Sequence, residues 1–385
     1  MHLSRRAMIA GAAAAPTLAH AAEIPGSGKP VFGTPLSAVS TPPRGYGPGA
    51  EPVIAPDPDV LRIDPSFGSL LIGQEVIRRV YTGLHLAEGP AWSAGGQYAI
   101  FSDVKNDTLY RYIWETGAVT VFRKPSFSTN GNTFDFQGRQ ISTQDFFRRV
   151  VRWEVDGSMS VIADAYDGKP LNSPNDVAAH KDGSIWFTDP QFGGNLAEGH
   201  PDAGDGPMNP GGVRDPAIGN SGVGIQKAGA MHQVLPMNVY RVDPDGRIAV
   251  AVPYEEGLAP NGLCFSPDYT KLYVIRGGRI FVGDIEGAKV TGLRLFTDCV
   301  VDGVRCSADG MRADRAGNIW ASAAAPLGYA GVTVWNPAGK LIGRIRLPEG
   351  CANLCFAGPK RDHLFMAATQ SIYLLRVNIQ GASPG

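Results

Sequence analysis

The chain has no excess of charge of either sign. Its 385 residues carry 35 Lys and Arg against 36 Asp and Glu, which gives a formal net charge of -1. Nucleic-acid-binding domains ordinarily show a basic face, and proteins that bind anionic membranes show a polybasic stretch. Neither feature is present in this sequence. We therefore expect no nucleic acid and no membrane surface as a partner, and a small neutral or anionic molecule as the substrate.

Long hydrophobic runs are also missing. The apolar run over residues 7–19 contains Gly11 and Pro16 and is shorter than the about 20 residues that a membrane span requires. It follows Ser4-Arg5-Arg6 and ends in a small-x-small pattern at residues 19–21, which is typical of signal peptidase sites. We predict a twin-arginine-like signal peptide over residues 1–21, cleaved on export to the periplasm or the medium. An ordinary secretory signal and an uncleaved anchor are the alternatives.

The motifs of several common enzyme classes are absent. The sequence has no GxSxG nucleophile elbow, no HExxH zinc motif, no Walker loop and no GxGxxG after a strand. These absences disfavour a serine esterase, a zinc hydrolase and a nucleotide-dependent enzyme.

Cysteine is scarce, with five residues and neither a CxxC pair nor the Cys/His spacing of a zinc site. An exported chain could form two disulfides, with Cys299/Cys306 and Cys351/Cys355 as the nearest pairs and one thiol left over. However, Cys264 and Cys355 each stand in a Leu-Cys-Phe triplet, which favours small buried apolar residues instead.

Glycine and proline are abundant, and strand-like motifs repeat. The 49 Gly and 30 Pro are roughly a fifth of the chain against about 12% on average, so turns are frequent and elements short. No segment has a convincing apolar stripe of helical period, and we expect little helix. Related motifs recur about 45 residues apart, which is typical of a β-propeller. The six motifs are EGPAW, NGNTF, PNDVA, PNGLCF, DGMRAD and ANLCF.

These repeats predict an all-β fold, a six-bladed β-propeller over residues 61–380. Residues 22–60 are rich in Pro and Gly and lack apolar periodicity, so we expect an extended or disordered leader there. The strand-like segment 75–81 lies before the first motif. We expect it to join the last blade and close the ring, because closure removes exposed sheet edges.

One polar residue stands at the same place in five of the six motifs. Equivalent positions of a propeller converge on its axis, and five oxygen-bearing side chains without His or Cys predict a site for one hard divalent cation. Calcium is the first choice, with magnesium, manganese, zinc or iron as alternatives. A single Asn or Asp at this place could instead form a turn. Five oxygen-bearing residues at the same place in their motifs favour a cation site. These residues, which we call head residues, are Glu88, Asn130, Asn175, Asn261 and Asp309, and the sixth motif has Ala352 followed by Asn353.

The two carboxylates among the head residues indicate hydrolytic chemistry. Glu88 and Asp309 would neutralise a dication, whereas the asparagines add carbonyl oxygens without charge. A cation held in this way can polarise an ester carbonyl and stabilise the developing oxyanion. A carboxylate beside it can take a proton from the attacking water, and we assign this role to Asp309.

The interval between Asn175 and Asn261 is nearly twice as long as the others. Its excess, residues 191–236, is Gly-rich without strand patterning, which indicates a long loop in the third blade and not a seventh blade. The loop leaves after the second strand and returns to the third, so we expect it over the cation site as a lid or pocket wall. Its candidate substrate contacts are His200, Arg214 and His232, each of which could also be an ordinary solvated loop residue.

Over residues 64–376 the motifs resemble those of the gluconolactonase and regucalcin (senescence marker protein) family of sugar lactonases. The stretches that carry the resemblance are EGPAW, DGKPLNSPNDVAAHKDGSIWFTDPQFG, APNGLCFSPD, DGMRADRAGNIW and NLCFAGP. The resemblance implies a six-bladed propeller with one axial divalent cation that hydrolyses an aldonolactone to the aldonic acid. It implies Glu88, Asn261 and Asp309 as metal ligands and Asp309 also as the base. It places Asn175 at the metal or its water and in contact with substrate, and Asn130 in the substrate pocket.

The sequence departs from the family pattern at Arg276 and in the stretch VRCSADGM, since family members have a simpler approach to the DGM motif. Family members commonly have an aspartate or a small polar residue where this chain has Arg276. We expect Arg276 and Arg279 in the loop between the second and third strands of the fourth blade, on the cation's face. There they would bind a carboxylate or phosphate of the substrate or form a surface hairpin pair. Phe146, Phe147 and Tyr329 are candidates for lining the same pocket, with core or rim packing as the alternative.

Three functions fit these residues. The first is metal-dependent hydrolysis of a sugar lactone such as gluconolactone. The second is a related propeller hydrolase that acts on other esters or on phosphotriesters. The third is a binding module whose cation is structural, and such a site would be enclosed by protein ligands instead of keeping open positions.

Overall fold

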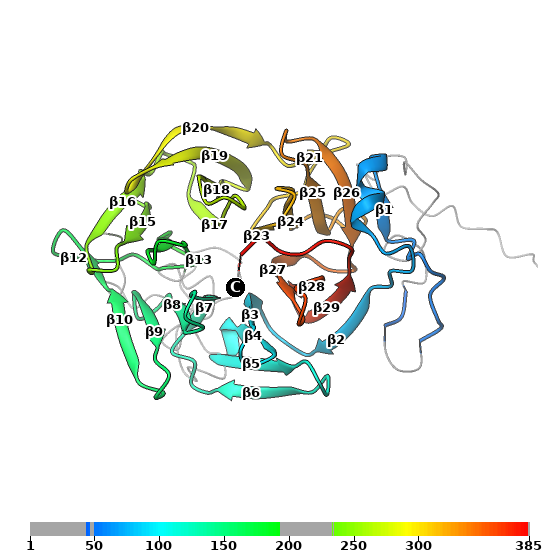
Figure 1. The fold of residues 1–385 in the computed structure, drawn as a ribbon, viewed down its shortest axis with the longest axis horizontal. Helices are drawn as coiled ribbons and strands as arrows, with labels where there is room; N and C mark the ends of the chain where they lie inside the picture. The colour runs from blue at the N-terminus through cyan, green and yellow to red at the C-terminus, as the bar shows by residue number, and fades with distance from the viewer. Residues whose placement is uncertain (1–43, 47–49, 193–232, 234, 384–385) are drawn as a thin grey trace, which may run out of the picture.

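The computed structural model describes residues 44–46, 50–192, 233 and 235–383. Its regular structure is β-sheet apart from two short 3₁₀ helices, η1 (Pro65–Leu70) and η2 (Val104–Asn106). Six antiparallel sheets stand side by side around a central axis (Figure 1). The predicted six-bladed β-propeller with little helix is therefore confirmed.

Each of the first three blades is a four-stranded meander whose first strand lies at the axis (Figure 1). Blade 1 consists of β3 (Ala87–Ser93), β4 (Tyr98–Asp103), β5 (Thr108–Ile113) and β6 (Val119–Arg123). Blade 2 consists of β7 (Thr129–Phe134), β8 (Gln140–Gln144), β9 (Arg149–Trp153) and β10 (Met159–Ala163). Blade 3 consists of β13 (Val177–Ala179), β14 (Ile185–Thr188), β15 (Val239–Val242) and β16 (Ile248–Val252).

The last three blades repeat this order, with N-terminal strands added to two of them. Blade 4 consists of β17 (Pro260–Phe265), β18 (Lys271–Arg276), β19 (Arg279–Glu286) and β20 (Lys289–Thr297). Blade 5 consists of β23 (Met311–Ala313), β24 (Ile319–Ala323), β25 (Gly331–Trp335), β26 (Leu341–Arg346) and the added β1 (Val60–Arg62). Blade 6 consists of β27 (Cys351–Ala357), β28 (His363–Ala368), β29 (Ser371–Arg376) and the added β2 (Arg78–Thr82). Two small hairpins pair β11 (Ala165–Tyr166) with β12 (Lys169–Pro170) and β21 (Val300–Val301) with β22 (Val304–Arg305).

The N-terminal strand closes the ring as predicted. Strand β2 pairs antiparallel with β29, so the outermost strand of blade 6 comes from the start of the propeller and its inner strands from the end. Because the first and last parts of the chain then share one sheet, blade 6 cannot separate from blade 1 without breaking this ladder.

A second N-terminal strand was not expected. Strand β1 pairs with β26 and gives blade 5 a fifth strand. Two buried aspartates hold this region: Asp57 accepts two hydrogen bonds from Arg44 at 2.8 Å each, and Asp59 lies 2.7 Å from Arg346 of blade 5. The described residues of segment 22–60, which we expected to be an extended or disordered leader, therefore include packed residues such as Arg44 and Asp57.

The hydrophobic core lies between the blades. Trp186 and Val239 of blade 3 pack with Leu263 and Val274 of blade 4, for example, and each such side chain is almost fully buried. Burial of one large apolar side chain contributes about 1.5–3 kcal/mol. Since each face is buried only by the next blade, the stability of the fold depends on the complete ring.

All five cysteines are free and buried in the structure. This agrees with their interpretation as small buried apolar residues, and neither of the two possible disulfides is formed. Among the described residues, no helix has both the length and the apolar character needed to cross a membrane. The predicted signal peptide, residues 1–21, lies outside the described part of the chain.

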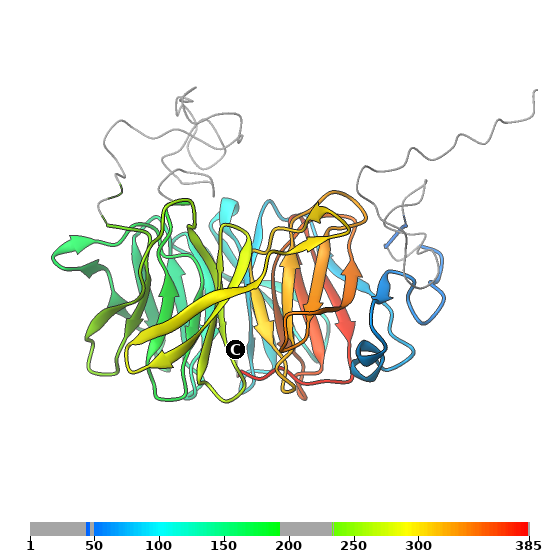
Figure 2. The same ribbon diagram turned by 90° about the horizontal axis from the view of Figure 1, so that it is seen from above.

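The ring has two distinct faces (Figure 2). The head residues begin the inner strands at one face. The C-terminal segment, drawn in red, runs along the other face and ends at the axis (Figures 1 and 2). We call the opening on the first face the channel mouth.

Candidate active site

The six head positions form one ring at the channel mouth. In four of the six motifs the residue after the head position is glycine, and its backbone N–H can donate to the carbonyl oxygen of the next blade's head residue. Three such inter-blade hydrogen bonds are Gly131 to Asn175 at 2.9 Å, Gly262 to Asp309 at 2.8 Å and Gly310 to Ala352 at 2.8 Å. The head residues are therefore equivalent in space as well as in sequence.

The glycines are required by this close approach. A Cβ atom at Gly131 would lie 2.4 Å from the carbonyl oxygen of Asn175, and one at Gly262 would lie 2.3 Å from that of Asp309. Real Cβ atoms do not come so near to a backbone oxygen. Glycine thus allows neighbouring inner strands to meet and brings their head residues together.

Polar residues replace glycine at this second position in blades 3 and 6. They are Asp176 and Asn353, both buried. The Asn353 amide donates to Glu88 Oε2 at 3.2 Å, and the backbone N–H of Gly89 donates to the same oxygen at 3.0 Å. Motif phasing did not identify Asp176 as a site residue. The sequence signal that could have identified Asp176 is an aspartate at a position where four other motifs have glycine.

Exposure of the head residues varies around the ring. Glu88, Asn130 and Asn175 are buried, at 7%, 1% and 6% relative exposure. Asn261 and Asp309, in the adjacent blades 4 and 5, are half-buried. The most accessible head residues with polar side chains therefore belong to neighbouring blades, which leaves one sector of the site open toward a ligand.

Cys351 precedes the head position of blade 6 and is buried. Burial raises the pKa of this thiol well above its ordinary value, and the negative charges of Glu88, Asp309 and Glu349 raise it further. The thiol is therefore protonated at neutral pH and is unsuited to act as a nucleophile.

Hydroxyl groups of the second strands hold the backbone of the head residues. Ser102 donates to the carbonyl oxygen of Asn130 at 2.8 Å, and Thr143 donates to that of Asn175 at 2.6 Å. Ser322 accepts the backbone N–H of Asp309 at 3.0 Å. Such support from rigid strands keeps the side chains of a site oriented before a ligand binds.

The residues present fit a hard divalent cation. Two carboxylates and three asparagines supply oxygen atoms, which calcium and magnesium prefer, and they balance a charge of +2. In the described part of the chain no three His, Cys, Asp or Glu residues cluster at metal-binding distance. Any cation bound here would therefore depend on amide oxygens, and zinc, which favours nitrogen and sulfur ligands, is the poorest fit.

An aspartate at the end of β14 holds the chain that leads to the head position of blade 3. Asp189 accepts the backbone N–H groups of Asn172 and Ser173 at 2.8 Å each. Burial raises the pKa of Asp189 to about 7, although these two hydrogen bonds oppose the rise. Asp103 in blade 1 holds His85 and Leu86 in the same way, so this is a repeated structural device.

Arg276 does not lie in a loop, contrary to our expectation. It is the last residue of β18 and pairs with Arg279 across a two-residue turn, in which Gly277 and Gly278 have φ of 57° and 74°. Two positive φ values allow the tightest hairpin, so the strand continues to the turn. The Arg276 side chain is only 4% exposed and lies 3.4 Å from Glu255 Oε2, whereas Arg279 is exposed.

Other predicted contacts have different surroundings. Tyr329 is buried, and the Arg344 guanidinium lies 4.5 Å from its ring centroid, so Tyr329 belongs to the core. Phe146 and Phe147 pack edge to face at 5.2 Å, and Phe147 is exposed. These two phenylalanines lie at the turn after β8, on the face of the channel mouth.

The predicted insertion, residues 191–236, falls between β14 and β15 of blade 3, and most of it lies outside the described residues. Its described flanks are joined by a 3.0 Å hydrogen bond from Asp189 N to Asn238 O. His200, Arg214 and His232 lie outside the described residues.

Comparison with known proteins agrees with this arrangement. The family model described as SMP-30/Gluconolactonase/LRE-like region matches residues 86–370. The chain is 29% identical over 352 residues to the gluconolactonase of Zymomonas mobilis subsp. mobilis, with 84% of this chain and 87% of that protein covered.

Solved structures share the fold. A gluconolactonase from Xanthomonas campestris has a TM-score of 0.66 at 28% identity, covering 83% of this chain and 94% of its own. The calcium-binding regucalcin from Agrobacterium tumefaciens strain C58 has a TM-score of 0.60 at 19% identity, covering 80% and 95%. With the family model spanning most of the propeller, the chain belongs to the SMP-30/gluconolactonase/LRE-like family.

Proposed function

We propose that this protein hydrolyses a sugar lactone, such as gluconolactone, to the aldonic acid with the help of one divalent cation. The observation that carries the proposal is the placement of Glu88 and Asp309 at equivalent positions of one ring of oxygen-bearing side chains. The gluconolactonases from Zymomonas mobilis and Xanthomonas campestris, at 29% and 28% identity, support this substrate class.

Glu88, Asn175, Asn261 and Asp309 would hold the cation. When bound, the cation supplies Lewis acidity to the lactone carbonyl. Asp309, half-buried in the accessible sector, takes a proton from the attacking water while the water oxygen forms a bond to the carbonyl carbon. The ester C–O bond then breaks, and the proton held by Asp309 passes to the departing ring oxygen.

The asparagine amides are suited to hold the hydroxyl-rich substrate. We assign Asn130 and Asn175 to substrate binding, because an amide can donate to one sugar oxygen and accept from a hydroxyl. Arg276 and His232 remain proposed substrate contacts. The guanidinium of Arg276 has Glu255 beside it, so it would first have to exchange this partner for an anionic substrate group.

Replacement of Asp309 by Asn tests the proposal. The amide keeps the size of the side chain but cannot accept a proton, so we expect kcat for gluconolactone hydrolysis to fall by about 10²–10⁴. A pH-stat measures the acid released, and circular dichroism checks the fold. Asp298→Asn, at an exposed acid in the connection between blades 4 and 5, is the matched control and should keep full activity. Retained activity in Asp309→Asn would remove this residue from the mechanism.

Removal of the cation separates the enzyme from a binding module. If the cation takes part in catalysis, chelation abolishes turnover while the fold persists, and added Ca²⁺, Mg²⁺ or Mn²⁺ restores activity. Global unfolding on chelation would favour a structural cation instead. A panel of aldonolactones and phosphotriesters then distinguishes a lactonase from the related propeller hydrolases, because the metal chemistry is shared and the surrounding loops select the substrate.

We also propose export through the twin-arginine route to the periplasm or the medium, on the basis of Arg5, Arg6 and the apolar run that follows. Mass spectrometry of the protein from its native host should find an N-terminus after Ala21. An intact Met1 would contradict this proposal.

A further inference from the structure

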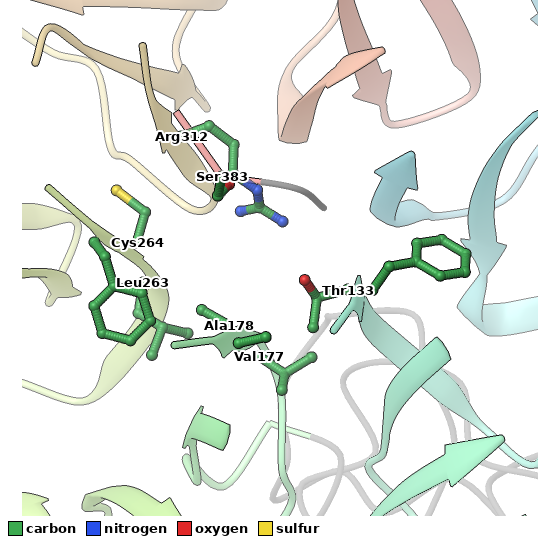
Figure 3. A pocket seen from close by; sticks show the side chains of 10 residues that line it. Thr133, Val177, Ala178, Leu263, Cys264, Arg312 and Ser383 are labelled. Atoms are coloured by element: carbon green, nitrogen blue, oxygen red, sulfur yellow. The ribbon is translucent and has the colours of Figure 1, made fainter. Parts of the chain in front are cut away.

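A small pocket lies in the central channel, below the head residues (Figure 3). It is lined by inner strands of four blades and by the C-terminal segment. Figure 3 shows the guanidinium of Arg312 extending from β23 into this space, toward the hydroxyl of Thr133. The lining residues are Thr133, Phe134, Val177, Ala178, Ala179, Leu263, Cys264, Phe265, Arg312 and Ser383.

Arg312 is an unusual residue for this place. It is 5% exposed, its Nη1 donates to the backbone oxygen of Met311 at 2.8 Å, and its Nη2 has no hydrogen-bond partner among the described residues. A buried cation is costly unless an opposing charge compensates it. That charge is Asp176, whose Oδ2 lies 3.8 Å from Arg312 Nη1.

Asp176 connects Arg312 to the layer of residues directly below the mouth. It accepts the backbone N–H of Val177 at 2.9 Å and that of Leu263 in blade 4 at 3.4 Å. Asp176 also interacts with the side chain of Asn353. Because Asp176 belongs to blade 3 and Asn353 to blade 6, this interaction spans the axis between opposite blades.

The amide of Asn353 has a fixed orientation. Its Oδ1 accepts the backbone N–H of Leu354 at 2.8 Å, so its nitrogen must face the carboxylates. One carboxylate is Asp176 and the other is Glu88, whose Oε2 lies 3.2 Å from Asn353 Nδ2. A side-chain amide has two N–H donors, one for each carboxylate.

We propose that Arg312 is a positioning residue, which acts through Asp176 and Asn353 to hold the Glu88 carboxylate in place for the divalent cation. The inference rests on the proposed function, because Glu88 is one of its metal ligands. Without Arg312, Asp176 is a buried negative charge with no cation beside it. The Asn353 amide then loses its interaction with Asp176, which weakens the orientation of one of the donors to Glu88.

Calcium binding provides a readout other than activity. Isothermal titration of the chelator-treated full chain with CaCl₂ gives the dissociation constant directly. We expect Arg312→Met to weaken binding by about 10–100-fold, the usual effect of losing a partner that orients a metal ligand. Arg312→Lys, which keeps the positive charge, should recover most of the affinity. Asn353→Leu leaves the Arg312–Asp176 pair intact and should weaken binding like Arg312→Met.

A second buried ion pair of blade 5 supplies the control. Arg346 and Asp59 are as deeply buried as Arg312 and Asp176, but Arg346 lies on the outer strand β26 and Asp59 directly before β1, away from the channel. The double variant Arg346→Met/Asp59→Asn should lower the melting temperature and leave the calcium dissociation constant unchanged. An equal loss of calcium affinity in this control would show that the effect of Arg312 is general destabilisation.

These experiments distinguish the proposed metal site from the proposed positioning role of Arg312. If the wild-type protein binds neither Ca²⁺ nor Mn²⁺, the proposed metal site is wrong. If it binds them and both Arg312→Met and Asn353→Leu keep wild-type affinity, the metal site stands and the positioning role of Arg312 is wrong. If Arg312→Met does not fold, Asn353→Leu alone decides between loss of affinity, which supports the proposal, and retained affinity, which overturns it.

Discussion

The glycine that follows the head residue in four of the six motifs determines how closely two blades meet at the channel mouth. A Cβ atom at Gly262 would lie 2.3 Å from the carbonyl oxygen of Asp309 and 2.8 Å from Cα of Gly310. Both contacts involve backbone, which cannot move aside as the end of a side chain can. The position of Asp309 therefore depends on the absence of one methyl group in the neighbouring blade.

We expect Gly262→Ala to lower both stability and activity. The extra methyl group pushes blades 4 and 5 apart, which costs about 1–3 kcal/mol or more, and it displaces Asp309 from the ring. Urea unfolding and kcat for lactone hydrolysis measure the two effects. Gly95→Ala is the control, because nothing lies within 4 Å of its added Cβ. A Gly262→Ala variant with wild-type kcat would show that the spacing of these strands does not position Asp309.

The head residues could be identified from the sequence because they stand at the same place in a repeated motif, and the backbone of each blade sets this spacing. The repeated pair of a head residue and glycine reflects one inter-blade hydrogen bond, so it is visible without knowledge of any side-chain contact. Arg312, Asp176 and Asn353 could not be connected in the same way. They lie in three different blades, and only the closed ring brings a residue from each to the axis.

Among the strands, β2 is the one that closes the ring. It pairs with β29 through Arg78, Arg79, Tyr81 and Thr82 and leaves no open edge on the inner strands of blade 6. Strand β1, in contrast, adds to the outside of a blade that is already complete. The two N-terminal strands should therefore differ in importance.

Truncation at two points tests this difference. A chain that begins at Gly73 lacks β1 and η1 but keeps β2, and we expect it to fold with a lowered melting temperature. A chain that begins at Gly83 lacks β2 as well, so it exposes the edge of β29 and should aggregate or unfold without cooperativity. Circular dichroism melts and size-exclusion chromatography distinguish the two. Cooperative folding of the shorter chain would mean that β2 is dispensable for closure.

The elements differ in how well their sequences predicted them. Segment 75–81 contains four β-branched or aromatic residues and no glycine, so the strand that became β2 was recognisable. Strand β1 has only three residues, and its pairing with β26 depends on the Asp59–Arg346 contact across the fold. The end of β18 at Arg276 was missed because a Gly-Gly pair fits a loop as well as a two-residue turn.

At the scale of the whole molecule, the two ends of the channel differ. The head residues surround the mouth, while residues 380–383 cross the opposite face toward the axis (Figures 1 and 2). Ser383 lines the same cavity as Arg312. The C-terminal segment therefore limits the access of water from this opposite face to the buried Arg312–Asp176 pair. Because water is kept away, the electrostatic attraction between the two side chains stays strong.

Deletion of residues 380–385 should loosen this covered end. It removes three backbone hydrogen bonds, from Arg315 to Gln380, from Gly381 to Arg361 and from Ala382 to Ala313. At about 0.5–1.5 kcal/mol each, their loss lowers the free energy of unfolding by about 2–4 kcal/mol. Urea unfolding measures this change, and hydrogen exchange should show faster exchange of the β23 amides around Arg312.

The matched control is Gln380→Ala, which shortens a side chain but keeps all three backbone bonds. It should leave both stability and exchange near the wild-type values. If the deletion variant also keeps wild-type exchange in β23, the C-terminal segment does not protect the channel. If exchange increases while calcium affinity falls, water entering from the covered end reaches the residues that orient Glu88, and the two ends of the channel are energetically coupled.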